Sequence, residues 1–210
     1  MKTSAISLLL LLGVSLLLAL SLGLACGGDG DNGAGEDTAS PTASPTSSPT
    51  SSPTASPLPG ITSGPLFDYL TSFLEIVEDA ESGTIGAVER FNETSLEVSA
   101  EERIPAMQTY LSEIETVFTD AIDRLEALSV PDIAVTHHET FIEGARGSVD
   151  AGNSLRLELP DIETLVQLDE RLAQFDAEVD AAVEISNAAC LELQAIADAE
   201  VLAIDLDCQD

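Results

Sequence analysis

Seven apolar residues between positions 107 and 128 recur at heptad spacing, and this pattern limits the fold more than any other feature of the chain. They form two interleaved sets: Met107, Ile114, Ala121 and Leu128, and Leu111, Phe118 and Leu125. Residues at such positions form one stripe along an α-helix, and the acidic residues between them fall on the other faces. The pattern predicts a long helix that begins near 103–105 and ends at Val130-Pro131. We expect Leu111, Phe118 and Leu125 to be buried.

Three further segments carry apolar residues at steps of three and four, the spacing of a helix face. These segments are 66–91, 131–152 and 161–200. In the first segment, Gly83 and Gly86 predict a kink or a break. A loop over 153–160 is expected after the second segment, and Asp161 is the predicted N-cap of the third.

Four amphipathic segments joined by short connections predict an all-α fold, an up-down-up-down four-helix bundle formed by residues 64–210. These 147 residues are enough for one well-filled core. The alternative is an elongated helical hairpin or coiled coil that completes its core by forming a homo-oligomer.

The first 26 residues form an apolar leader that ends in a cysteine. Lys2 is followed by an uncharged stretch from Ala5 to Ala25, and then by Cys26 and two glycines. This segment resembles the lipobox signal of bacterial lipoproteins, although Gly23 occupies the position where that family usually has leucine. The resemblance implies a signal peptide over 1–25 and a lipid on Cys26, which would anchor the protein to the bacterial cell membrane on its extracytoplasmic side. The alternative is an uncleaved signal-anchor helix, because about 20 apolar residues also span a bilayer.

Residues 26–63 have the composition of a spacer. A Gly/Asp-rich stretch is followed by five tetrads of the form Thr-x-Ser-Pro, which run from Thr38 to Pro57. Nothing in these tetrads is apolar enough to offset the entropy lost on ordering, so the composition predicts a disordered linker. Proline at every fourth position favours an extended chain.

Charge excludes several classes of partner. The chain has 38 acidic residues against seven Lys and Arg, a net charge of −31, and its only lysine is Lys2. Residues 64–210 contain 34 acids and six arginines, a net of 6 − 34 = −28. Binding to nucleic acid needs clustered Lys and Arg, and so does electrostatic binding to anionic lipid. The membrane is therefore expected as a partner only through the lipid on Cys26.

Two cysteines remain once Cys26 is assigned to lipid. Cys190 lies in the last predicted helix, and Cys208 lies in the acidic tail that follows it. In an extracytoplasmic protein an even pair predicts a disulfide. A redox-active pair usually has C-x-x-C spacing, which is absent here. We therefore expect a structural bridge that fastens the tail to the bundle.

The chain contains few residues suited to catalysis or metal binding. Its only histidines are His137 and His138, and Ile142 stands where the zinc-protease pattern H-E-x-x-H needs a second histidine. The Glu-x-x-His pattern of di-iron bundles fails too. His138 falls on the predicted inner face, where it is either a metal-ligand candidate or an ordinary interior histidine. No cofactor and no enzymatic activity are expected.

Two functions are consistent with these features. The first is a non-enzymatic, surface-tethered lipoprotein whose acidic helical domain binds a protein partner. The alternative is a carrier of a small ligand, metal or haem, with a pocket inside the bundle that uses His138.

Overall fold

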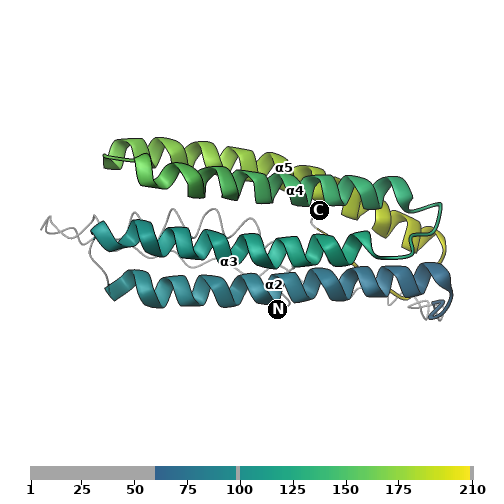
Figure 1. Ribbon diagram of the computed structural model, residues 1–210. Coiled ribbons are helices and arrows are strands. Elements are labelled where there is room, and N and C mark those ends of the chain that lie inside the picture. Colours follow the sequence, from purple (N-terminus) through teal and green to yellow (C-terminus); the bar gives the residue numbers. More distant parts are fainter. Residues whose placement is uncertain (1–59, 98–99, 209–210) are drawn as a thin grey trace, which may run out of the picture.

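The computed structural model describes residues 60–97 and 100–208 (Figure 1). The helices are α2 (Pro65–Glu97), α3 (Ala100–Glu126), α4 (Val135–Glu158), the short 3-10 helix η1 (Leu159–Asp161) and α5 (Leu165–Ala199). Consecutive long helices run in opposite directions, and the α2/α3 pair lies beside the α4/α5 pair. The predicted all-α, up-down-up-down four-helix bundle is therefore confirmed. The leader 1–25, Cys26 and the linker as far as residue 59 lie outside the described residues.

Two clusters of buried side chains form the core. One lies toward the α2 N-terminus and α5 C-terminus, where Phe73 of α2 meets Phe141 of α4 edge to face, with ring centroids 4.8 Å apart. The other includes Met107 and Leu111 of α3, near the opposite end of the bundle. Each cluster takes a different part of the heptad stripe, so the stripe is what holds α3 against both ends of the core.

One member of the stripe is placed differently from the prediction. Leu111 and Leu125 are buried, as predicted, but Phe118 is only half-buried. An α-helix advances 3.6 residues per turn, so a strict seven-residue repeat drifts about 20° per heptad on a straight helix. The neighbouring Ala121 and Ile122 are buried instead, which shows how the buried face shifts along α3.

Several predicted helix limits are wrong. The helix α2 continues without a break through Gly83. The missing side chain there lets Val117 of α3 approach closely, since a Cβ atom at Gly83 would lie 3.0 Å from Val117 Cγ1. The helix α3 begins at Ala100, so Pro105 lies inside it. The helix α4 extends to Glu158, through the predicted loop. Glycine and proline thus lower the helix propensity at these places without ending the helices.

The N-cap of α5 is Thr164 and not Asp161, which belongs to η1. The Thr164 hydroxyl accepts a hydrogen bond from Gln167 N, and the Gln167 side-chain oxygen accepts one from Thr164 N. This reciprocal capping box satisfies two main-chain donors at the helix start. The predicted N-cap at Asp161 is therefore three residues too early.

Helices α4 and α5 approach closely at Gly144. A Cβ atom there would clash with Ser186 Oγ and would lie 2.6 Å from the Ala182 carbonyl oxygen. Gly147, one turn further along, faces Ala182 as well. Small residues thus bring the two backbones together, and the glycines that lower the helix propensity of α4 are what this contact requires.

This contact predicts opposite effects for two Gly→Ala substitutions in α4. Gly144→Ala should lower the free energy of unfolding by about 1–3 kcal/mol, because the new methyl group meets main-chain atoms that cannot move aside. Gly152→Ala, where a Cβ atom would meet nothing within 4 Å, should raise it by up to about 1 kcal/mol through helix propensity alone. Urea unfolding followed by circular dichroism measures both. Equal effects of the two substitutions would contradict the close α4–α5 contact.

Candidate functional site

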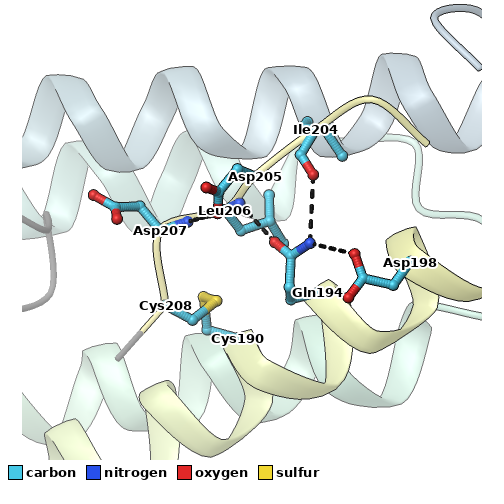
Figure 2. The surroundings of a disulfide bond; sticks show 8 residues. All are labelled: Cys190, Gln194, Asp198, Ile204, Asp205, Leu206, Asp207 and Cys208. Carbon is cyan, nitrogen blue, oxygen red and sulfur yellow. Dashed lines mark hydrogen bonds between the residues drawn. A yellow bond between two sulfur atoms is a disulfide. The ribbon is translucent and has the colours of Figure 1, made fainter. Parts of the chain in front are cut away.

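The C-terminal tail forms a strap, defined here as residues 201–208, that lies along the side of the bundle where α5 faces α2 (Figure 2). Its alternate residues point into the core: Leu206 is buried, and Leu202, Ile204 and Cys208 pack against the first core cluster. Between them, Val201, Ala203 and Asp205 are exposed, and Asp207 is half-buried. This two-residue period is that of a half-buried extended chain, so the strap covers apolar surface that consecutive helices leave open.

One side chain of α5 holds the strap backbone. Gln194 donates from Nε2 to the Ile204 carbonyl oxygen at 3.3 Å, and its Oε1 accepts from Leu206 N at 2.7 Å (Figure 2). Nε2 also donates to Asp198 on the same helix, at 2.9 Å. The amide of Gln194 thus acts as a substitute for a neighbouring strand, and it satisfies main-chain groups that would otherwise be left unpaired.

The chain reverses direction at the end of α5 through a Schellman motif. Leu202 N donates to the Ala197 carbonyl oxygen at 2.9 Å, and Val201 N donates to that of Asp198 at 3.1 Å. Val201 occupies the left-handed position with φ of 57°, where glycine is usual. A β-branched residue in this conformation costs of the order of 1–3 kcal/mol. The packing of the strap has to offset that cost.

The strap is also attached covalently, because Cys190 of α5 and Cys208 form a disulfide with their Cα atoms 5.8 Å apart. The predicted pairing of these two cysteines is thus seen in the structure. Cys190 is buried, and the bridge lies against the first core cluster. At the other end of the strap, Ile61 exchanges main-chain hydrogen bonds with Val201 and Ala203, 2.8 and 3.0 Å long. The strap is therefore held at both ends and in the middle.

The described arginine side chains all lie at interfaces between consecutive helices, where each pairs with an acid of the adjacent helix. The pairs are Arg90–Glu113 and Arg124–Asp79 between α2 and α3, Arg146–Glu126 and Arg156–Glu115 between α3 and α4, and Arg171–Glu158 between α4 and α5. These five positive charges are thus paired with acids of the same domain. The strap and its disulfide occupy the remaining side, between α5 and α2.

Arg171 is the most buried of these arginines, with its side chain 9% exposed. Its Nε donates to Glu158 at 2.6 Å, and one of its terminal nitrogens donates to Ser154 Oγ at 3.1 Å. Hydrogen bonds from Ser154 and Arg171 lower the pKa of the Glu158 carboxyl group. This cluster fixes the α4–α5 connection.

His138 is buried, and its ring has a partner on α2. The Tyr69 hydroxyl lies 3.1 Å from His138 Nδ1, and the two rings meet edge to face. Burial lowers the pKa of His138, and this effect outweighs Glu139, the main chain of Leu125 and Glu126, which raise it. His138 is thus a neutral interior residue that joins α4 to α2.

Beside His138 the surface has a groove of about 960 Å³, here named the α4 groove. Residues of α4 form its base, Glu126 and Val130 border it on the α3 side, and Ile185 of α5 borders it on the other. Its apolar lining residues are Val130, Val135, Ile142 and Ile185, and its acidic lining residues are Glu126, Glu139, Glu143 and Asp150. The acidic residues are all exposed, whereas Ile142 is buried, so an apolar floor lies under an acidic rim.

The sequence singled out only His138 among the residues at this groove. Acidic residues such as Glu139 and Glu143 are ordinary on a solvated helix face, so no local signal marked them. Ile185 lies in the predicted helix 161–200, and its side chain is 41% exposed at the edge of the groove. The packing of α3 and α5 against α4 is what gathers these side chains.

No protein-family model, curated protein or solved structure matches the chain. Within residues 60–97 and 100–208, no group of three or more His, Cys, Asp or Glu side chains is arranged to hold a metal ion. None of the helices in those ranges is both long enough and apolar enough to cross a membrane.

The disulfide predicts a measurable effect of reduction. It closes a loop with a sequence separation of 18, for which chain entropy gives about 3 kcal/mol. Adding dithiothreitol should therefore lower the free energy of unfolding of the wild type by about that amount, as measured by urea unfolding. The variant Cys190→Ala/Cys208→Ala is the control, and it should not respond to dithiothreitol. An unchanged wild-type transition under full reduction would contradict a stabilising role for the bridge.

The environment of His138 predicts a pH dependence. The folded state lowers the pKa of His138, so the unfolded chain takes up a proton first, near the ordinary histidine pKa of about 6.5. The free energy of unfolding of the wild type should therefore fall, relative to that of His138→Gln, as the pH drops from 7 through 6.5 and lower.

The raised pKa values of Glu81 and Asp176 act in the opposite direction, because these carboxyl groups stabilise the fold as they are protonated. Their contribution is common to both proteins and cancels in the difference. His137→Gln is the matched control and should keep the wild-type pH dependence. A difference between wild type and His138→Gln that does not change with pH would contradict the neutral, buried state of His138.

Proposed function

We propose that this chain is a lipid-anchored, extracytoplasmic lipoprotein whose acidic helical domain binds a protein partner without catalysing a reaction. Three parts support the proposal. The leader ends in Leu24-Ala25-Cys26, the Thr/Ser/Pro-rich segment has the composition of a spacer, and a disulfide-closed bundle follows. A disulfide is typical of oxidising compartments outside the cytoplasm.

The observation that carries the binding function is the location of positive charge. The five described arginine side chains pair with acids at helix interfaces, so they do not offset the charge of other surface regions. Residues 64–210 keep a net charge of −28. A surface of this kind attracts cationic partners over long range and speeds their association, while it repels nucleic acid and anionic lipid.

The carrier alternative depends on His138 as a ligand. Its Nδ1 is engaged by the Tyr69 hydroxyl and its side chain is buried, so binding of iron, zinc or haem through that nitrogen would first have to break a buried hydrogen bond. The α4 groove also lies at the surface and not inside the bundle. We therefore retain the interaction domain as the proposed function.

The anchor is tested by fatty-acid labelling in a bacterial host. Cells grown with a labelled fatty acid should incorporate the label into the wild-type protein, which should fractionate with the membrane. Cys26→Ala should remain unlabelled, because it lacks the thiol that receives the lipid. The double variant Cys190→Ala/Cys208→Ala should still be labelled, which controls for the other cysteines. An unlabelled wild type that retains Lys2 would establish the signal-anchor alternative instead.

A further inference from the structure

We propose that the α4 groove docks a basic amphipathic helix from a partner protein, with the apolar face of that helix on the groove floor and its lysines or arginines on the acidic rim. This inference rests on the proposed function, since it specifies the partner of the interaction domain. Three features of the groove carry it: its shape, its charge and the absence of a suitable occupant in the chain itself.

The apolar lining of the groove combines buried Ile142 at its floor with half-buried Val130 and Val135 and exposed Ile185, which supply the accessible apolar area. Val135 and Ile142 lie on one face of α4, and Val130 and Ile185 extend this surface on either side. The groove follows α4 from Val135 to Asp150, which at 1.5 Å per residue is about 22 Å. A partner helix of about 15 residues matches that length and would place anchors at i, i+3, i+4 and i+7 on the floor.

The rim selects for positive charge. Arg146 is the only Lys or Arg among the lining residues, and it pairs with Glu126. Glu139, Glu143 and Asp150 therefore keep the rim strongly negative. Lys or Arg side chains that flank an apolar stripe would meet these carboxylates at the edge of the groove, where complementary charge determines partner choice and association rate.

The same charge excludes the other occupants. A second copy of the chain would bring another domain with a net charge of −28 against the acidic rim. Residues 27–60 contain no Lys or Arg and carry four acids, so the chain's own linker does not complement the groove either. A small apolar ligand would need to be largely enclosed, whereas the rim side chains here are exposed to solvent. A basic amphipathic segment satisfies both the floor and the rim.

The test is fluorescence anisotropy with the full-length processed protein, purified in a non-ionic detergent. The probe is a labelled 16-residue peptide of Leu and Lys arranged as an amphipathic helix. Two control peptides accompany it: one of the same composition in a scrambled order that is not amphipathic, and one with Glu in place of Lys. The amphipathic Leu/Lys peptide should bind, the scrambled peptide should bind more weakly, and the Leu/Glu peptide should not bind.

Two pairs of variants separate the groove from general acidity. Glu139→Gln/Glu143→Gln removes two rim charges, and Glu75→Gln/Glu89→Gln removes two exposed charges from α2. The groove pair should weaken binding about three- to tenfold, as expected for two solvent-facing ion pairs, while the α2 pair should have little effect. Ile185→Ser removes an apolar side chain at the edge of the groove and should also weaken binding. Ile85→Ser is its matched control, because Ile85 of α2 is 38% exposed against 41% for Ile185.

Thermal unfolding of each variant shows whether the bundle is intact before its binding is compared. Equal losses in the groove and α2 variants would mean that the peptide responds only to net charge and would overturn the proposal. Binding of the scrambled peptide as tight as that of the amphipathic one, or no binding of either, would overturn it too. Cys26→Ala should bind the peptide like the wild type. Failure of lipidation would therefore refute the anchor alone, and failure of peptide binding would refute the groove alone.

Discussion

An excess of 28 negative charges in residues 64–210 is the constraint that the rest of the structure has to meet. Like charges favour the expanded chain, so apolar burial must outweigh their repulsion. The arginines cannot do so alone, because an exposed ion pair contributes only about 0–1 kcal/mol. Their positions still matter: by joining consecutive helices, they reduce repulsion where acidic faces come closest. The two core clusters have to supply the main stabilising free energy.

The strap adds apolar burial on the side of the bundle between α5 and α2. The described arginine pairs join only consecutive helices, and this remaining side is covered by an extended segment with an apolar inner face. Gln194 satisfies part of its backbone, and the Cys190–Cys208 disulfide limits the entropy that the tail gains on unfolding. The left-handed Val201 shows that the reversal into the strap is maintained at a conformational cost.

The helix α4 contributes to the packing of the bundle on one side and to the proposed docking groove on the other. On its inner side, α4 presents His138 to Tyr69 of α2, and it approaches α5 through Gly144. On its outer side the same helix carries the floor and much of the rim of the α4 groove. Docking on α4 would therefore take place on a rigid helix held from both sides, which limits the entropy lost on binding.

The sequence alone was enough for the fold class, because the period of apolar residues and the short connections between segments admit few all-α arrangements. It also predicted the Cys190–Cys208 pair, since an even number of cysteines remained after Cys26 was assigned. It did not predict the helix limits near Gly83, Pro105 and Gly152, because glycine and proline lower helix propensity without ending these helices, and it placed the cap of α5 three residues before the capping box at Thr164.

The role of His138 and the formation of the α4 groove were decided by tertiary packing, which the local sequence pattern does not encode. Whether His138 is a ligand or an interior residue depends on Tyr69, which lies 69 positions away in the chain. The α4 groove likewise exists only because packing brings Val130 and Ile185 to either side of α4. Sequence periodicity assigns a residue to a face of its own helix, but the neighbour that the face meets is determined by long-range packing.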